Sequence, residues 1–254
     1  MQLTDTHTHI YYQEGQALDD QIKRCLENNI TKLFLPNVDV ASIPQVFNTV
    51  TAYPEYCFPM LGLHPCSVQE NYQQELDTIH QALTQHHVYA IGEIGLDLYW
   101  DKSTLAWQKE AFRIQVAWAK ERNLPIAIHC REAFDEQFEL LEELKDDKLY
   151  GIFHCFTGNL EQALRAISLG FYLGIGGVLT FKNAGLDSVI QQIDLQHIVL
   201  ETDAPYLAPV PHRGKPNESS FLLYIAQKLA EIYEKPLAEI AAITSQNAKK
   251  VFGI

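Results

Sequence analysis

Short apolar runs of strand length alternate along this chain with longer stretches in which apolar residues recur every three or four positions. The short runs predict buried strands, and the longer stretches, such as 104–122 and 134–145, predict amphipathic helices. A last helix is expected from about Leu237 to Phe252, packed on the outside of the fold. The predicted strands are Leu3–His9, Lys32–Pro36, Cys57–Leu63, Val88–Ile94, Pro125–His129, Gly151–Cys155, Phe171–Ile175 and His197–Glu201.

These strand and helix units follow one another without a linker rich in Pro, Gly or Ser. Parallel strands joined by helices form one continuous sheet, and eight such units in about 250 residues are enough to close it into a barrel. We therefore predict an α/β fold, a single (β/α)8 TIM barrel, with residues 1–254 as one domain.

Composition and charge indicate where in the cell the protein is located and which kinds of partner it can bind. The chain has no run of eighteen apolar residues, and its first residues lack the basic and then apolar segment of a secretory signal. Five cysteines without a C-x-x-C pair indicate reduced thiols. We expect a cytoplasmic protein that does not bind a membrane. The net charge of −13 disfavours a protein that coats nucleic acid with a broad basic surface, but it allows a phosphate substrate next to bound cations.

Side chains that can bind metals lie at the ends of several predicted strands. In a barrel the reactive groups come from the carboxyl ends of the strands, so these side chains should share one mouth. His7 and His9 are two residues apart in the first predicted strand, and both should therefore point to the same face. The candidate ligands are four imidazoles and two carboxylates: His7, His9, Glu93, His129, His154 and Asp203.

Six ligands are more than one zinc ion normally uses, so they predict two divalent metals that share a bridging carboxylate and a bridging water. Glu93 is the candidate bridge. Metals that lower the pKa of the shared water to about 7 supply a hydroxide nucleophile, which predicts a hydrolase. Imidazoles suit zinc, manganese or iron, and the carboxylates also admit magnesium.

The motifs that carry these ligands resemble those of TatD-type metal-dependent deoxyribonucleases, a hydrolase family of the amidohydrolase-like superfamily. They occur in the family's order and cover nearly the whole chain: His7–His9, Gly92–Asp97, Ile128–Arg131, Phe153–Gly158, Thr180–Ala184, Glu201–Leu207 and His212–Lys215. The resemblance implies cleavage of phosphodiester bonds in DNA by an exonuclease that acts on single strands or 3′ ends. It also implies two sets of metal ligands, one of His7, His9, Glu93 and Asp203 and the other of Glu93, His129 and His154.

Several further residues suit a phosphodiester substrate. Arg131 and Arg213 carry planar guanidinium groups that match nonbridging phosphate oxygens, and Lys182 adds a point charge. Asp203 is expected to take a proton from the attacking water. His64, in the Gly-Leu-His-Pro segment after the third predicted strand, either touches substrate or caps a turn.

Aromatic residues follow two of the ligand motifs. Tyr99 and Trp100 lie on a loop above the same mouth, where they either stack a terminal base or pack the loop. After His9 the chain continues Ile10-Tyr11-Tyr12, whereas the family commonly has leucine and aspartate. We expect these residues to alter substrate binding without contacting a metal ligand.

Two other functions fit parts of the pattern. An amide or ester hydrolase, such as an aminoacyl-tRNA deacylase, would use the same ligands, because an activated water attacks an acyl carbon as readily as phosphorus. Assays on both substrate classes separate the two, and Arg213→Ala should impair phosphodiester cleavage more. The remote alternative is a non-catalytic scaffold that keeps a metal for stability, which would bind metal without hydrolysing any ester, amide or phosphodiester.

Overall fold

The computed structural model describes residues 1–254 and contains eight parallel strands separated by helices. The strands are β1 (Leu3–Asp5), β2 (Ile30–Pro36), β3 (Cys57–Met60), β4 (Ile91–Asp97), β5 (Ile126–Arg131), β6 (Gly151–Phe153), β7 (Phe171–Ile175) and β8 (Ile198–Leu200). The helices are α1 (Gly15–Glu27), α2 (Ile43–Ala52), α3 (Tyr72–Gln85), α4 (Leu105–Arg122), α5 (Phe134–Leu144), α6 (Leu160–Ser168), α7 (Leu186–Ile190), α8 (Leu222–Tyr233) and α9 (Leu237–Phe252).

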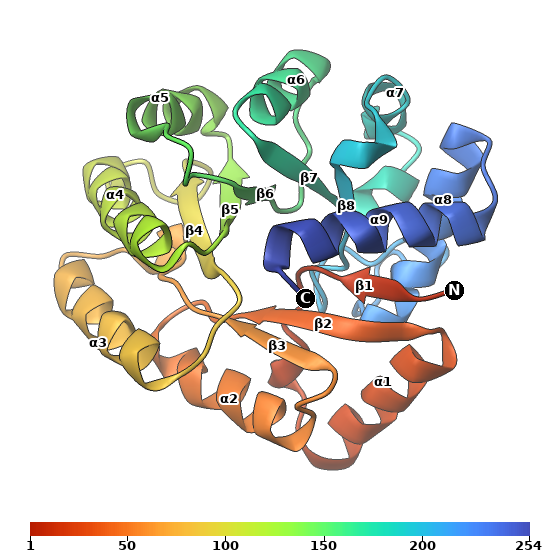
Figure 1. Ribbon diagram of the computed structural model, residues 1–254, viewed down its shortest axis with the longest axis horizontal. Helices are drawn as coiled ribbons and strands as arrows, with labels where there is room; N and C mark the ends of the chain where they lie inside the picture. Colours follow the sequence, from red (N-terminus) through yellow and green to blue (C-terminus); the bar gives the residue numbers. More distant parts are fainter.

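Hydrogen bonding between the strands follows chain order, in one set from β1 to β3 and another from β4 to β8. Backbone contacts join the two sets at both seams. Leu61, directly after β3, pairs with Ile91 of β4, and the Thr6 amide after β1 donates to the Leu200 carbonyl of β8 at 3.0 Å. The strands therefore form the predicted (β/α)8 barrel, with helices around its outside (Figure 1).

The barrel interior is apolar toward the amino ends of the strands. Alternate strand residues point inward, so Phe34 faces the interior while Leu33 and Leu35 pack against the surrounding helices. The inward-facing residues form one cluster with the end of α9: Phe34, Phe58, Met60, Ala90, Ala127, Ile152, Val199, Ala248, Val251 and Phe252. This cluster makes a dry floor beneath the polar mouth.

The last helix differs from its prediction. Packing on the outside of the barrel was expected, but α9 lies across the amino end, where the Phe252 ring stacks on Phe34 with centroids 3.9 Å apart (Figure 1). The Asn247 side chain donates to the carbonyls of Leu195 and Ile198 at the start of β8. The prediction failed because an apolar stripe on a helix does not say whether it covers a barrel's side or its open end.

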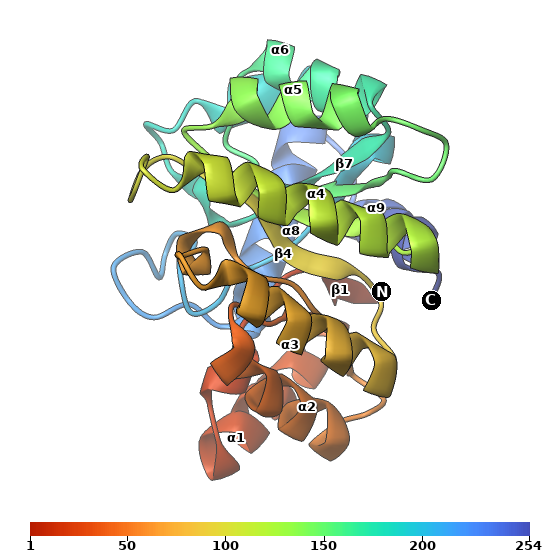
Figure 2. The same cartoon turned by 90° about the vertical axis from the view of Figure 1, so that its left-hand side faces the viewer.

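The two ends of the barrel therefore have different roles. Both termini lie at one end of the molecule, and the long loop from β8 to α8 extends from the other end (Figure 2). That second end carries the loops after the carboxyl ends of the strands, where barrel enzymes hold their reactive groups. None of the helices combines the length and the apolar character needed to cross a membrane.

A glycine in β4 lets β4 and β5 approach closely. Gly95 has a φ of +144°, and a Cβ there would lie 2.0 Å from the His129 carbonyl oxygen. We expect Gly95→Ala to lower the free energy of unfolding by about 2 to 4 kcal/mol in urea denaturation, because the backbone conformation and the overlap are both unfavourable. Gly15→Ala is the matched control: Gly15 also has a positive φ, +53°, but no atom lies within 4 Å of its added Cβ. It should cost about 1 kcal/mol, and equal losses would refute the steric explanation.

Candidate metal centre

The six predicted ligands come together at the carboxyl end of the barrel. All are buried or nearly so, although they belong to strand ends distributed around the whole barrel: His7 and His9 after β1, Glu93 in β4, His129 in β5, His154 after β6 and Asp203 after β8. Asp5 ties two of these segments together, since its carboxylate accepts from the amides of His7 and Thr202 at 3.3 and 2.9 Å. Burial raises the pKa of Asp5 to about 7.

Glu93 lies at the middle of the cluster, and its two carboxylate oxygens face different imidazoles. Oε2 is 3.2 Å from Nε2 of His7 and 3.8 Å from Nε2 of His9. Oε1 is 2.9 Å from Nδ1 of His129 and 3.0 Å from Nε2 of His154. Each oxygen of this carboxylate therefore faces its own imidazoles, which suits a bridging ligand.

Asp203 completes the side that contains His7 and His9. Its Oδ1 lies 3.5 Å from Nε2 of His9 and 3.9 Å from Nε2 of His7. Burial alone would raise the pKa of Asp203, but the nearby imidazoles of His9, His154 and His7 lower it overall. The carboxylate is therefore ionised at neutral pH.

The first strand is shorter than predicted. Strand β1 ends at Asp5, so His7 and His9 do not share a strand face. The segment after it is held instead by β2 and by the chain that follows β8: the Thr8 amide donates to the Phe34 carbonyl, and the His9 amide donates to the Ala204 carbonyl. The two imidazoles still converge, but these contacts, and not a shared strand face, fix the backbone that carries them.

The buried carboxylates of the cluster favour positive charge on the groups next to them. Burial alone would raise the pKa of Glu93, but the imidazoles of His154, His64 and His7 and the hydrogen bond with His129 hold it well below its ordinary value. Burial lowers the pKa of His154, yet its flanking carboxylates, Glu93 and Glu201, raise it well above the ordinary value overall. The buried carboxylates thus require nearby cations, which either protons on the imidazoles or metal ions supply.

The donor set fits divalent ions. His7 is fully buried, yet neither of its ring nitrogens has a hydrogen-bond partner, although buried polar atoms are normally paired. Three groups of imidazoles and carboxylates have ligand atoms within 4.8 Å of one another: His7, His9 and Asp203; His7, His154 and Glu201; and His64, Glu93 and His129. Nitrogen and carboxylate donors at such separations suit zinc, manganese or iron.

Two acids behind the ligands orient their imidazoles, and the sequence analysis assigned neither of them a role. Asp97 Oδ2 lies 2.8 Å from Nε2 of His129, and Glu201 Oε1 lies 3.1 Å from Nδ1 of His154. A ring nitrogen that donates to a carboxylate leaves the opposite nitrogen free to bind a metal, and in both residues that nitrogen faces Glu93. The sequence did contain a signal for these two acids, because residues an even number of positions apart on an extended chain point to the same face. Asp97 is four residues after Glu93, and Glu201 is two residues before Asp203.

Gly174 leaves the room that the Glu201 carboxylate needs. A Cβ at position 174 would lie 2.2 Å from Oε2 of Glu201, and Glu201 itself is fully buried. The same carboxylate also accepts the Cys155 amide through Oε1 at 2.6 Å. Because Gly174 has no side chain, the Glu201 carboxylate can occupy this place and hold the His154 ring in position.

The residue after Ile10 also differs from expectation, because Tyr11 does touch a predicted ligand. Its hydroxyl lies 2.8 Å from Nδ1 of His9 and donates to the Pro36 carbonyl at 2.8 Å. The prediction failed because β1 ends early and residues 10–12 turn back as a 3-10 helix, which brings Tyr11 under His9.

His64 caps a turn, which is one of its two predicted roles, and its other ring nitrogen faces the cluster. Its Nδ1 accepts the Cys66 amide at 3.1 Å, and its Nε2 lies 3.3 Å from Oε1 of Glu93. Because Nδ1 is the acceptor, Nε2 of the neutral ring carries the proton. His64 therefore presents a donor to the centre. Burial lowers the pKa of His64, and the opposing charge of Glu93 only partly offsets this effect.

The predicted phosphate-binding residues Arg131, Arg213 and Lys182 lie at the same end of the barrel and form no ion pair. Arg131, the last residue of β5, holds its guanidinium 3.7 Å from the centroid of the Tyr99 ring. Arg213, between β8 and α8, lies over Phe181 at 4.3 Å, next to the exposed Lys182. Their positive charges are therefore not neutralised by the many acids of the chain.

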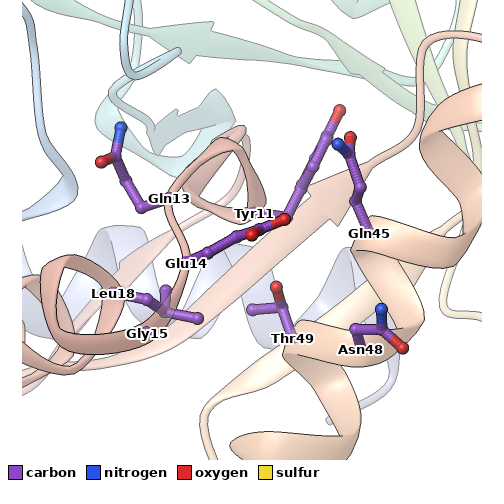
Figure 3. Close-up of a pocket in the computed structure, with 8 residues that line it drawn as sticks. All are labelled: Tyr11, Gln13, Glu14, Gly15, Leu18, Gln45, Asn48 and Thr49. Carbon is purple, nitrogen blue, oxygen red and sulfur yellow. The ribbon is translucent and has the colours of Figure 1, made fainter.

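A separate hollow lies beside the centre, between the start of α1 and helix α2 (Figure 3). It has a volume of about 290 Å³ and is lined mostly by polar side chains, including Gln13, Gln45 and Asn48, none of which is a predicted ligand. Tyr11 lies at its edge, and its hydroxyl points away from Asn48 (Figure 3). Tyr11 is thus the side chain shared by this hollow and the imidazole cluster.

Comparison with known proteins gives consistent matches over nearly the full length. The family model described as TatD related DNase matches residues 4–253. An uncharacterized metal-dependent hydrolase of Bacillus subtilis, YabD, is 38% identical over 254 residues, with 99% of each chain covered. The 3′-5′ ssDNA/RNA exonuclease TatD of Yersinia pseudotuberculosis is 33% identical over 240 residues, with 91% of each chain covered.

A solved structure agrees with the fold. The crystal structure of YjjV, a TatD homologue from Escherichia coli K12, has a TM-score of 0.91 and 28% sequence identity. The match covers 99% of this chain and 98% of that one. Similarity in sequence and structure therefore extends through every strand that carries a candidate ligand.

Binding of divalent ions should stabilise the protein against heat. Metal-stripped protein is compared with the same protein after addition of zinc or manganese at about 100 times the dissociation constant. Such binding stabilises the native state by about 2.7 kcal/mol, which corresponds to a melting temperature roughly 5 to 10 °C higher. Glu93→Gln should lose most of this increase because Glu93 faces both halves of the cluster. An equal increase in that variant would contradict the role of Glu93.

Proposed function

Because the chain belongs to the TatD related DNase family and is a metal-dependent hydrolase, we propose that it removes nucleotides from the 3′ ends of single-stranded DNA. The observation that carries this proposal is Glu93, a buried carboxylate whose Oε2 faces the His7 imidazole and whose Oε1 faces those of His129 and His154. The Yersinia pseudotuberculosis relative named as a 3′-5′ ssDNA/RNA exonuclease supports the direction of digestion and the strandedness.

The proposed site holds two divalent ions. His7, His9 and Asp203 would hold one ion, His129 and His154 would hold the other, and Glu93 would bridge them. Ions bound there would neutralise charge on the phosphate and lower the pKa of a water to about 7. The arrangement of Asp97 and Glu201 behind the second pair supports this assignment, because each leaves one ring nitrogen free toward Glu93.

Two side chains would handle protons during cleavage. Asp203 is ionised and lies at the mouth with 13% of its side chain exposed, so it would accept a proton from the attacking water. His64 carries a proton on Nε2 and would donate a hydrogen bond to a phosphate oxygen above Glu93. Asp97, which bonds to His129 and to the amide of Tyr99, would keep the second ion's ligand in place.

The rim of the mouth suits an unpaired nucleic acid strand. Arg131, Arg213 and Lys182 supply positive charge that no acid of the chain neutralises, and each would contact phosphates. Tyr99 and Trp100 are 48% and 71% exposed, so their rings are open to stacking with bases. Stacking contributes about 1 to 3 kcal/mol per base and needs bases that are not already paired, which favours single strands.

Loss of either central carboxylate should stop DNA hydrolysis. We expect Glu93→Gln and Asp203→Asn each to lower kcat/KM on a labelled single-stranded oligonucleotide by about 100-fold or more, because a bridging ligand and a proton acceptor are removed. Circular dichroism is used to check that both variants are folded. If the folded variants release nucleotides at the wild-type rate, the proposed roles of Glu93 and Asp203 are wrong.

The phosphate-binding role of Arg213 distinguishes a nuclease from an acyl hydrolase. We expect Arg213→Ala to reduce kcat/KM for oligonucleotide cleavage by about 10-fold, a loss of about 1.4 kcal/mol, with less effect on hydrolysis of an aminoacyl ester. Arg165→Ala is the matched control, since Arg165 pairs with Glu142 on the outer helices. If the wild-type protein cleaves the acyl ester and leaves DNA intact, the proposed function is wrong.

A further inference from the structure

Three imidazoles of the cluster, those of His129, His154 and His9, each have a side-chain hydrogen-bond partner on the ring nitrogen that faces away from Glu93. Two of these partners are carboxylates and the third is a phenol. His129 and His154 are backed by the carboxylates of Asp97 and Glu201. His9 is backed by a neutral phenol, that of Tyr11, at 2.8 Å from Nδ1. A carboxylate only accepts hydrogen bonds, whereas a phenol both donates and accepts, so the state of the His9 ring depends on where the phenol proton goes.

The second contact of Tyr11 settles where that proton goes. The Tyr11 hydroxyl lies 2.8 Å from the carbonyl oxygen of Pro36, the last residue of β2. A carbonyl accepts and never donates, so the single phenol proton is directed to Pro36. The lone pairs of the phenol oxygen then face Nδ1 of His9, which must be the donor. The Tyr11 side chain is only 1% exposed, so water does not compete for these contacts.

We propose that Tyr11 is a positioning residue that selects the Nδ1–H tautomer of His9 and so keeps Nε2 free to bind a metal. In this tautomer the free Nε2 faces Glu93 and Asp203, at 3.8 and 3.5 Å. In the other tautomer Nε2 would carry the proton and could not bind an ion. The Pro36 carbonyl thereby connects the end of β2, which carries no ligand, to the metal centre. This inference rests on the proposed metal site for its consequence, whereas the contacts of Tyr11 with Pro36 and His9 that select the tautomer are present without metal.

The test compares the tautomer and metal binding in Tyr11→Phe. Metal-stripped, ¹⁵N-labelled protein is studied by histidine NMR at about pH 8, above the ordinary imidazole pKa of about 6.5. Wild-type His9 should carry its proton on Nδ1, and Tyr11→Phe should shift the ring toward the Nε2–H form. Competition with a chromophoric chelator should then show about 10- to 100-fold weaker binding of one ion and little change for the other.

Tyr206→Phe is the matched control. The Tyr206 ring lies edge-on to the His9 ring with centroids 6.0 Å apart but has no hydrogen bond to it, so this variant should keep both the tautomer and the metal affinity. An Nδ1–H tautomer that persists in Tyr11→Phe, or equal losses of affinity in the two variants, overturns the inference. If the wild-type tautomer is Nδ1–H and shifts as expected while no metal or nuclease activity is found, the proposed function fails and the role of Tyr11 stands.

Discussion

The structure around the barrel mouth depends on one buried carboxylate, that of Glu93. An ionised carboxylate removed from water costs several kcal/mol unless positive charge and hydrogen bonds compensate it. Here imidazoles from β1, β3, β5 and β6 segments surround it, and their charge keeps its pKa low. Because the partners come from different strands, the carboxylate is satisfied only when the barrel is closed. Its stability and its capacity to hold cations therefore depend on the same geometry.

The molecule is layered along the barrel axis in a way that supports this centre. At the amino end α9 and the inward-facing strand residues form a dry, close-packed floor. Above the floor lie the ligands and the acids that orient them. At the rim, unpaired cations rest on aromatic rings. A chain with a net charge of −13 can thus present positive charge at one opening, because the arginines there are not paired with acids.

The bounds of several helices and strands and the grouping of the candidate ligands could be predicted from the sequence, because residue spacing and hydrophobic pattern reflect them directly. Strand β7 has its predicted bounds, and α4 and α5 each differ from theirs by one residue. All six candidate ligands lie in one cluster because the carboxyl ends of barrel strands necessarily meet. The errors share another cause. The place of α9, the early end of β1 and the contact of Tyr11 with His9 depend on which distant segment each of them meets.

The sequence by itself determined the alternation of elements, the set of candidate ligands and the chemistry they suit, since these follow from residue type and spacing. Only the tertiary structure decided which nitrogen of each ring faces Glu93. That choice depends on partners brought from elsewhere in the chain: Glu201 for His154, Asp97 for His129, and the Pro36 carbonyl acting through Tyr11 for His9. A hydrogen bond acts over about 3 Å, so residues far apart along the chain can set a tautomer only after folding has placed them in contact.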